Sequence, residues 1–391
     1  MFYRQRDPGP VIVQPVSRVR RSATRFRSVL AGSCFCLLLL LPALDQWLGL
    51  SSSFQSTEKR TLSPRPVLQL PHVMTFVDQF NQYYKESFGG RNALFYAYSH
   101  WKLSVLGQSP LPEKVVVGKD GWFYPGNFFA DVARQHQGLR PISRSMMQAI
   151  AARLSRYQQQ LARRGARLYV MVAPDSHTIY PEYLPDNLQR TATSANLDAL
   201  YKYLQQHTTV SVIDIRRPLL DAKAVRPVYY QTDTHWNEFG AVVASTALVN
   251  YLRHDYPTLP EARLSDYRFR PVTGVGGDLT TMLAVNDSYR DMVQYKVTSL
   301  TGAGARQTAS IPNAEMNLPS SRFVGQQASR PRLLFVGDSF SYSLNQYLPP
   351  YFSASFLVRS RHFNPQLVQA EQSDIVVIEV VERNLHMLAD L

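Results

Sequence analysis

The chain has 391 residues, of which 45% are hydrophobic and 18% charged, and its formal net charge is +13. A chain of this size and composition buries one large core or two modest ones, which excludes a disordered chain, a collagen-like repeat and a disulfide-stabilised miniprotein. Seven arginines and one aspartate precede residue 29, so nearly half of the excess charge lies on a short N-terminal tail. Because the sequence shows neither an arginine-rich recognition helix nor an RNA-binding aromatic motif, we expect no nucleic-acid partner.

An apolar segment follows this basic tail, residues 1–28. Residues 29–44 carry no charge, and apolar character resumes after Asp45. We therefore expect residues 29–50 to form a transmembrane signal anchor, with the N-terminus in the cytoplasm and everything after residue 50 exported. The alternative is a cleaved signal peptide, for which the sequence offers no good small-x-small cleavage site and which leads to the same compartment.

Both cysteines of the chain, Cys34 and Cys36, lie inside that apolar segment. The exported part therefore contains no disulfide, thiolate metal site or cysteine nucleophile. Residues 51–74 are rich in serine, proline and charge, which is typical of a linker. Residues 75–391 have the composition of a globular domain without internal repeats.

Short apolar strands alternate with helices through this domain. Helical periodicity covers residues 146–164 and precedes a buried strand at 168–173. The same alternation of apolar and helical patterns predicts, in order, strand 210–215, helix 238–253, strand 332–336, strand 355–358, helix 365–372 and strand 374–380. This alternation indicates an α/β fold with three layers, α/β/α, around a central parallel sheet. Residues 256–331 do not show this alternation of strands and helices, and we interpret them as an insertion with some antiparallel strand.

In an open α/β sheet, ligands bind beyond the carboxyl ends of the strands. One polar cluster, Gly-Asp-Ser-Phe-Ser at residues 337–341, directly follows the strand at 332–336, and a helix is expected to begin near Tyr342. A serine on such a turn projects its hydroxyl into the cleft, and its own N–H can receive an oxyanion. Ser339 is therefore a candidate nucleophile.

A second polar cluster, Thr-Asp-Thr-His-Trp-Asn at residues 232–237, is also expected at the end of a strand, and it leads into the helix expected from Glu238. Asp233 stands two residues before His235, and on an extended turn two such side chains point the same way. The carboxylate can then hold one ring nitrogen while the other faces a nucleophile. His235 is therefore a candidate base and Asp233 its partner.

Each cluster alone has a simpler explanation. Gly-Asp-Ser is an ordinary turn with an N-cap serine, and Asp-x-His is often a capping carboxylate beside a surface histidine. Their joint occurrence in one exported domain without cysteine favours a catalytic group. Asp-x-His and Gly-Asp also occur in dinuclear metallophosphoesterases, but the sequence lacks the additional acid and the Asn-His element of those sites. We therefore expect neither a metal nor another cofactor.

With these residues the chain resembles the SGNH-hydrolase-like polysaccharide O-acetyltransferases of the AlgJ/AlgX type. The matching blocks cover about residues 75–391 in the order of that family, at 118–124, 173–185, 233–237, 277–279, 337–341 and 379–385. Ordinary SGNH hydrolases place the serine block first and Asp-x-His last, so the order here is the permuted one. The chain ends soon after the last block, without the carbohydrate-binding module that some members carry.

The resemblance implies an SGNH-like fold with Ser339 as nucleophile, His235 as base and Asp233 as its orienting partner. It implies O-acetylation of a secreted exopolysaccharide, alginate or similar, by two-step acyl transfer through a serine acetyl-enzyme. The implied partners are the polysaccharide acceptor, a membrane-bound acyl-transfer protein of the MBOAT type and a polysaccharide synthesis complex. The implied location is the inner membrane, crossed once, with the catalytic domain in the periplasm.

Four further residues are candidates for substrate binding. Arg359 and Arg361 follow the strand at 355–358, where they can meet an acidic sugar or the oxyanion, although a solvated arginine is the simpler explanation. His177 follows the end of a strand, and Trp236 adjoins the candidate base. For both of these residues a structural role is the alternative.

Two other functions fit the same sequence features. An acetyl-esterase acting on a glycan would use the same three residues, because the two activities differ only in whether water or a sugar reaches the acyl-enzyme. A non-catalytic glycan-binding scaffold on an SGNH-like fold is the other alternative, and the intact serine, histidine and aspartate argue against it.

Overall fold

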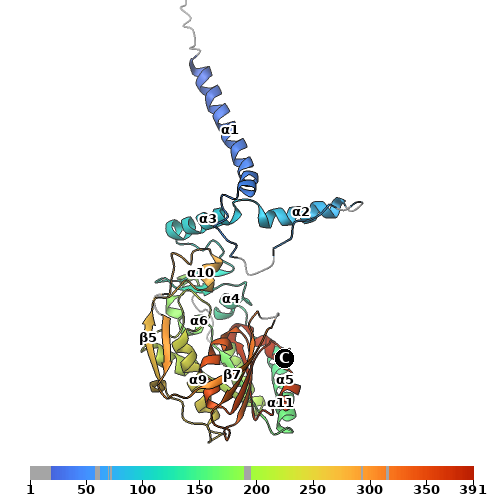
Figure 1. Cartoon of the computed structure of the whole chain (residues 1–391), viewed down its shortest axis with the longest axis vertical. Helices are drawn as coiled ribbons and strands as arrows, with labels where there is room; N and C mark the ends of the chain where they lie inside the picture. The colour runs from blue at the N-terminus through green and yellow to red at the C-terminus, as the bar shows by residue number, and fades with distance from the viewer. Residues whose placement is uncertain are drawn as a thin grey trace, which may run out of the picture. The chain divides into compact units, whose positions relative to one another are not determined.

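The computed structural model describes residues 19–57, 62–68, 70, 73–188, 195–291, 294–313 and 317–391. The chain forms two compact units, Met1–Ala97 and Tyr98–Leu391 (Figure 1). Of the expected basic tail, residues 1–18 lie outside the described part. Outside it as well are residues 58–61, 69, 71 and 72 of the expected linker.

The first unit contains a long apolar helix. α1 spans Val19–Leu48, and its part Phe26–Leu48 is long and apolar enough to cross a membrane. Gly49 ends this helix: at a φ of 65° it takes the left-handed conformation, and its N–H donates to the Asp45 carbonyl over 2.7 Å. The unit continues through α2 (Val73–Ser87) to the first residues of α3 (Arg91–Leu106). The expected anchor is therefore compatible with α1.

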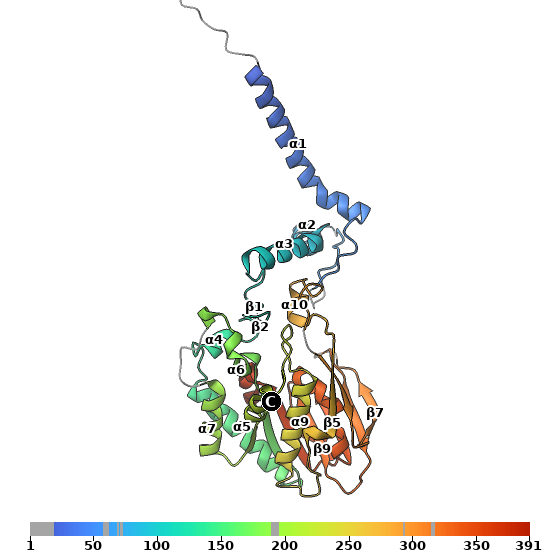
Figure 2. The same cartoon turned by 90° about the vertical axis from the view of Figure 1, so that its left-hand side faces the viewer.

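A seven-stranded sheet lies at the centre of the second unit, in the order β4-β3-β11-β9-β10-β8-β7, with β7 at its outer edge (Figure 2). The first five strands in this order run parallel. Their bounds are Ser211–Asp214 (β4), Arg167–Ala173 (β3), Ile375–Val381 (β11), Arg332–Gly337 (β9) and Ala354–Arg359 (β10). All five strands predicted from the apolar runs thus belong to one parallel array, which confirms the predicted fold class.

The helices of the second unit connect and cover these strands. The longest are α5 (Arg144–Ala162), α7 (Asn196–His207), α8 (Arg216–Lys223) and α9 (Glu238–Leu252). The other helical segments are α4 (Val132–His136), α6 (Ser176–Ile179), η1 (Pro181–Tyr183), η2 (Asp186–Leu188), η3 (Leu264–Asp266), η5 (Pro349–Tyr351), α11 (Gln366–Ala370) and η6 (Glu382–Ala389).

Alternate residues of the central strands enter two separate hydrophobic clusters. In β3, Tyr169 and Met171 belong to the cluster that includes α9, whereas Leu168 and Val170 belong to the cluster that includes α5 and α7. Successive side chains of a strand point to opposite faces of its sheet, so each cluster lies on one face. Helices therefore cover both faces, as the three-layer prediction requires.

The segment 256–331, interpreted above as an insertion, does contain antiparallel strands. β7 (Ala305–Ile311) and β8 (Ser320–Gly325) extend the central sheet beyond β10. β5 (Tyr267–Val272) pairs only with β6 (Gln294–Ser299) among the described strands, and a similar small pair joins β1 (Val115–Val117) to β2 (Phe123–Pro125). The short helix α10 (Asp278–Met282) lies between β5 and β6 in the chain. The segment is thus partly built into the main sheet.

The helix expected near Tyr342 begins earlier and has a different geometry. η4 is a 3-10 helix over Ser339–Gln346. The hydroxyl of Ser341 donates to the Asp338 carbonyl over 2.7 Å, and that of Ser343 donates to the Phe340 carbonyl over 3.2 Å. Serine side chains that bond to the backbone of the preceding turn compete with α-helical hydrogen bonding, which explains the tighter helix.

Candidate active site

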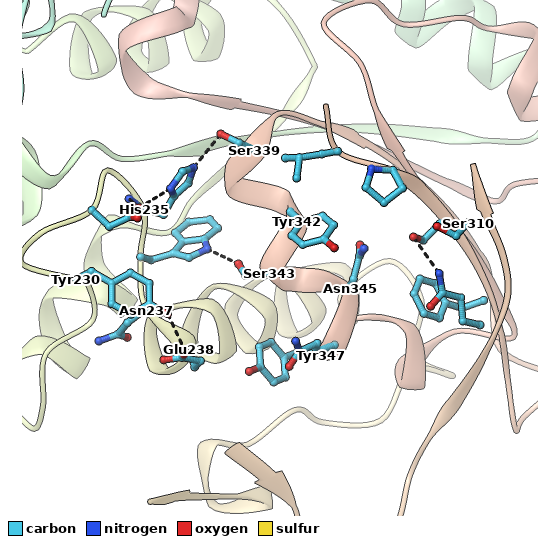
Figure 3. Close-up of a pocket in the computed structure, with 18 residues that line it drawn as sticks. Tyr230, His235, Asn237, Glu238, Ser310, Ser339, Tyr342, Ser343, Asn345 and Tyr347 are labelled. Carbon is cyan, nitrogen blue, oxygen red and sulfur yellow. Dashed lines mark hydrogen bonds and ion pairs between the residues drawn. The ribbon is translucent and has the colours of Figure 1, made fainter. Parts of the chain in front are cut away.

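The three residues predicted as a catalytic group lie together in the structure. Ser339 is the first residue of η4, immediately beyond the carboxyl end of β9. Its hydroxyl lies 2.9 Å from Nε2 of His235, and Nδ1 of the same ring lies 2.7 Å from Oδ1 of Asp233 (Figure 3). These distances allow a proton to pass from the serine to the imidazole while the carboxylate holds the ring.

The turn that carries Asp233 and His235 follows no strand of the central sheet. It lies between α8 and α9, and a bridge between Tyr229 and Trp236 closes it. Asn237 caps α9 by accepting the Gly240 N–H over 2.9 Å. The turn therefore reaches Ser339 from a neighbouring helix, whereas the sequence argument placed both clusters at strand ends.

A backbone contact that the sequence did not reveal holds Asp233. The N–H of Asp278 donates to Asp233 Oδ2 over 2.8 Å, and the N–H of His235 donates to Oδ1 over 3.1 Å. Asp278 also accepts the Thr234 N–H over 2.9 Å. A Cβ on the preceding Gly277 would lie 2.5 Å from the Asp233 Cβ, so only glycine allows this approach. The Gly-Asp pair at 277–278 thus supports the orienting carboxylate.

Asp291 forms a further layer behind this turn. Its carboxylate accepts the N–H groups of Gln231 and Thr232 over 2.6 and 3.0 Å, and the Thr232 hydroxyl over 2.6 Å. The same hydroxyl accepts the Gly277 N–H over 2.8 Å. Asp291 is 3% exposed, and every one of these bonds restrains the backbone next to Asp233. It is a positioning residue that the sequence reading missed.

The charges around His235, chiefly that of Asp233, favour the protonated form of its imidazole. Burial acts to lower the pKa of His235, but its hydrogen bond to Asp233 and the negative charges of Asp233 and Asp278 outweigh burial, so the pKa is raised above its usual value. Burial acts to raise the pKa of Asp233, but the hydrogen bond and charge of His235 hold that pKa below its usual value. The carboxylate thus stabilises the imidazolium that forms when the base accepts a proton.

The backbone around Ser339 is fixed on both sides. The N–H of Asp338 donates to Glu379 Oε2 over 3.1 Å, and Asp338 itself accepts the N–H groups of Phe340 and Val381 over 2.9 Å each. Among the described residues, the N–H of Ser339 itself has no hydrogen-bond partner. A free donor at this point is suited to an oxyanion on the acyl group attached to the serine.

Gly337 allows the close approach of this turn to Glu379. A Cβ at Gly337 would lie 2.5 Å from Glu379 Oε2 and 2.6 Å from the Ser341 hydroxyl, and both neighbours are buried. We expect Gly337→Ala to lower the free energy of unfolding by about 1–3 kcal/mol and to reduce activity by displacing Ser339. Chemical denaturation and the rate of ester cleavage measure the two effects.

Gly304→Ala is the matched control for that substitution, because a Cβ at Gly304 would meet only the Gln326 Nε2, at 3.9 Å. We expect this variant to unfold and react like the wild type. Equal stability and activity of the Gly337 and Gly304 variants would contradict the role assigned to the close approach.

A cavity of about 740 Å³ opens beside the serine and the histidine (Figure 3). It lies between η4, the turn before α9, the edge strand β7 and the neighbouring strand β8. The lining residues are Tyr230, Asp233, His235, Trp236, Asn237, Glu238, Gln307, Ser310, Leu318, Pro319, Ser321, Phe323, Ser339, Tyr342, Ser343, Asn345, Gln346 and Tyr347. Its volume is within the range of small-molecule and oligosaccharide sites.

Arg359, a candidate for substrate contact, is fully buried beneath η4 and does not line the cavity. Its guanidinium donates to the Ser341 hydroxyl and carbonyl over 2.9 and 3.0 Å, and to Asn345 Oδ1 over 2.6 Å. Burial lowers the pKa of Arg359 to about 10, although the charges of Glu379 and Asp338 oppose the shift. This side chain therefore supports η4, the helix that carries the candidate nucleophile Ser339.

The other three candidates occupy different places. Trp236 lines the cavity but is 1% exposed, and its Nε1–H donates to the Ser343 hydroxyl over 2.7 Å, which ties the His235 turn to η4. His177 is buried outside the cavity, with its ring 5.1 Å from that of Tyr124. Arg361 is exposed in the loop after β10 and does not line the cavity. Only the tryptophan thus lies at the site, chiefly as a packing residue.

An ion pair next to the site connects two residues whose pairing was not predicted from the sequence. Arg383 pairs with Asp175, and its guanidinium lies 5.5 Å from the centre of the Phe340 ring, which in turn lies 4.8 Å from the His235 ring. Glu382 accepts the Asp175 N–H over 2.9 Å. Burial, and then the charge of Asp175, raise the pKa of Glu382 to about 7. This network joins the end of β3 to the end of β11.

Asp233, His235 and Asp278 are near enough to one another to be compared with a metal site. Both ring nitrogens of His235 are engaged, by Asp233 and by Ser339, and Asp278 accepts hydrogen bonds from the Thr234 N–H and hydroxyl over 2.9 and 3.0 Å. The hydrogen bonds therefore account for the cluster without an ion.

The sequence matches the family described as SGNH hydrolase-like domain, acetyltransferase AlgX, over residues 115–381. Two curated relatives are each named probable alginate O-acetylase AlgJ. The protein from Pseudomonas aeruginosa is 25% identical over 58% of this chain and 55% of its own length, and the one from Pseudomonas syringae is 26% identical over 46% and 44%. The chain thus spans about half the length of the curated relatives it matches.

Among solved structures, PatB1 of Bacillus cereus superposes with a TM-score of 0.55, covering 70% of this chain and 98% of that protein. The sequence identity is 14%, so this likeness concerns the fold alone. The family match covers more than half of the chain and includes β9, β11 and all three residues of the Asp-His-Ser group. The chain therefore belongs to the AlgX-type family of SGNH hydrolase-like acetyltransferases.

Proposed function

We propose that this protein is an O-acetyltransferase that esterifies hydroxyl groups of a secreted exopolysaccharide, alginate or a similar glycan. The observation that carries the proposal is the hydrogen-bonded chain from Asp233 through His235 to Ser339, which borders an open cavity. The family membership and the names of the AlgJ relatives support acetyl transfer as its chemistry.

In the first step, Ser339 Oγ attacks the carbonyl carbon of an acetyl donor as its proton passes to His235 Nε2. The negative charge on the carbonyl oxygen is received by the Ser339 N–H. The bond to the donor's leaving group then breaks, and His235 gives the proton to that group. Acetyl-Ser339 and the free leaving group are the products.

In the second step, a sugar hydroxyl from the cavity attacks the acetyl carbon and transfers its proton to His235. The bond to Ser339 Oγ breaks, the serine recovers the proton from His235, and the acetylated sugar departs. Asp233 remains a carboxylate throughout and stabilises the imidazolium in both steps.

The location and partners belong to the same proposal. α1 would anchor the chain once in the inner membrane, which leaves the catalytic domain in the periplasm. An acetyl donor there requires export of acetyl groups, so a membrane-bound acyl-transfer protein of the MBOAT type is the proposed supplier. A polysaccharide synthesis complex would supply the acceptor.

The test measures how acetyl groups divide between water and sugar. The full-length protein in detergent is incubated with a chromogenic acetyl ester and increasing amounts of oligosaccharide. We expect acetylated sugar to increase while free acetate decreases. Free acetate as the only product at every acceptor concentration would identify an esterase, and normal polysaccharide acetylation in cells with Ser339→Ala would identify a scaffold; either result would overturn the proposal.

A further inference from the structure

The helix α2 of the first unit has an exposed apolar side. Four apolar or aromatic side chains of this helix are between 41% and 44% exposed: Val73, Val77, Phe80 and Tyr84. They follow one another at spacings of four, three and four residues, so they lie on one side of the helix. Large apolar side chains gathered in this way indicate a surface that another molecule covers.

A row of aromatic rings runs along the same side. The ring of Phe76 lies 5.9 Å from that of Phe80, which lies 6.2 Å from that of Tyr84. The row continues to Phe88, whose ring lies 5.9 Å from that of Tyr84. Aromatic side chains, tyrosine in particular, are enriched where a protein meets the boundary between lipid and water.

The opposite side of α2 is polar and already has partners within the first unit. Its residues are Asp78, Gln82, Lys85 and Glu86. Glu86 is buried, and its carboxylate accepts the Ser63 N–H over 2.6 Å and the Gln82 side-chain amide over 2.5 Å. The helix is therefore amphipathic, with one side bonded to the rest of the unit and the other side exposed.

α2 is attached to the end of the candidate membrane span α1. The side-chain amide of Gln46 donates to the Tyr83 hydroxyl over 3.1 Å, and Gln46 lies two residues before the end of α1 at Leu48. A Cβ on Gly89 would lie 2.6 Å from the backbone nitrogen of Gln46, so the chain directly after α2 also approaches this turn closely. The neighbouring Trp47 is 82% exposed, as expected of an aromatic anchor at the end of a span.

The side of α2 that faces α1 is the apolar one. Phe80 and Phe76 precede Tyr83 by three and seven residues, which places all three on the same side of the helix. The rings of Phe80 and Tyr83 lie 6.2 Å apart. Within the first unit, α2 runs across the direction of α1 (Figure 1). The aromatic row thus begins at the end of the span and extends away from it.

We infer that α2 lies along the outer membrane–water interface, with its apolar side among the lipid acyl chains. The inference rests on the proposed anchoring of the chain by α1. If α1 crosses the membrane with its N-terminus inside, Gln46 lies at the outer boundary, and its bond to Tyr83 places α2 at the same depth. An amphipathic helix in this position buries its apolar side about 5–10 Å into the boundary between headgroups and acyl chains.

The charge of α2 identifies acyl chains rather than anionic headgroups as its ligand. The helix has one lysine, Lys85, against the two acids Asp78 and Glu86. It therefore has no excess positive charge with which to attract an anionic lipid. We expect its insertion to be the same in neutral vesicles and in vesicles with added phosphatidylglycerol.

The test uses the full-length protein in phosphatidylcholine vesicles, with a fluorescent label on one cysteine at a time. Val77→Cys places the label on the apolar side, and Thr75→Cys is the matched control on the polar side, both with Cys34 and Cys36 replaced by alanine. Lipids with a nitroxide on the acyl chain near the headgroup quench a label in the membrane, and iodide quenches a label in water. We expect lipid quenching at residue 77 to be at least about 3-fold stronger than at residue 75, and iodide quenching to show the opposite order.

A third label separates failure of this inference from failure of the anchor. Cys34 lies within α1 and is labelled alone in a Cys36→Ala protein. Lipid quenching at Cys34 but equal quenching at residues 75 and 77 would overturn the inference and leave the anchor in place. Shielding of residue 77 from both quenchers would identify a protein as its cover, either a second copy or another chain, and would also overturn it. No lipid quenching at Cys34 would show that the proposed anchor itself is wrong.

A charge on the apolar side provides an independent check. In the protein labelled at residue 77, we expect Phe80→Glu to reduce lipid quenching by about 3-fold, because a carboxylate is costly among acyl chains. Thr75→Glu adds the same charge on the polar side and should leave the quenching unchanged. The rate of 4-nitrophenyl acetate cleavage in detergent should be equal in both variants, which confirms that the catalytic domain is intact. Equal quenching in the two variants would contradict the insertion of the apolar side.

Discussion

Replacement of Ser339 by alanine is expected to lower the rate of acetyl transfer by about 10⁴-fold or more, because the attacking oxygen is removed and His235 loses the group that it deprotonates. The remaining oxyanion donor and the cavity can still bind donor and acceptor. The rate of acetylated oligosaccharide formation, measured with saturating acetyl ester, gives the effect directly.

The fold should survive this change, since Ser339 lies at the partly exposed end of η4 and its hydroxyl bonds only to His235 among the described side chains. The melting temperature of the variant checks this point. Ser145→Ala, on the exposed side of α5, is the matched control and is expected to keep the wild-type rate. Transfer at a rate near that of the wild type in a folded Ser339→Ala protein would contradict the assignment of the nucleophile.

Asp233→Asn is expected to reduce the rate of acetyl transfer by about 10³–10⁴-fold, although asparagine has nearly the same size and shape as aspartate. Asp233 Oδ2 accepts the Asp278 N–H, and Oδ1 accepts from His235. If the asparagine oxygen keeps the Asp278 contact, its NH₂ group faces Nδ1 of His235. That nitrogen then becomes the acceptor, the proton moves to Nε2, and Nε2 can no longer accept the proton of Ser339.

The same variant should change the pH dependence. His235 acts as a base only when neutral, so the wild-type rate decreases as the pH is lowered through a pKa raised above the usual value of histidine. Loss of the Asp233 charge removes the main cause of that rise, and the acid limb of the residual activity should move to lower pH. Asp221→Asn, an exposed residue of α8, should leave the profile unchanged. An acid limb that stays in place would show that Asp233 does not set the pKa of the base.

The sequence predicted the parts of this structure that depend on local patterns. β3 and β11 are buried on both faces, so they appear in the sequence as nearly continuous apolar runs. The candidate nucleophile Ser339 and the candidate base His235 could also be selected from the sequence, since both stand in short polar clusters next to an apolar segment. These features need no knowledge of which distant residues meet.

The support of the site could not be predicted in the same way. Asp233 is held by the backbone N–H of Asp278, and any residue type provides such a donor, so the sequence carries no mark of the contact. Asp291 acts through the backbone of Thr232, 59 positions away. Arginine is usually found at the protein surface, but Arg359 is fully buried because η4 covers it. These roles follow from tertiary packing alone.

The geometry of η4 is a further example. A Gly-Asp-Ser turn predicts the start of a helix but does not distinguish an α-helix from a 3-10 helix, because that choice depends on the hydroxyl bonds of Ser341 and Ser343 to the preceding turn. In the tighter helix, residues three apart lie above one another, which places Ser339, Tyr342 and Asn345 on the side of η4 that lines the cavity.

The central claim is that Ser339 carries the acetyl group between donor and acceptor, and the mass of the intact protein tests it most directly. The full-length chain is mixed with 4-nitrophenyl acetate and quenched in acid, and the mass of the intact protein is measured by mass spectrometry. The modified peptide is then identified by peptide sequencing. We predict one adduct of about 42 Da, an acetyl group in place of a proton, on the peptide that contains Ser339, and its loss when a glycan acceptor is added before the quench. An adduct on another residue, or equal acetylation of Ser339→Ala, would contradict the account.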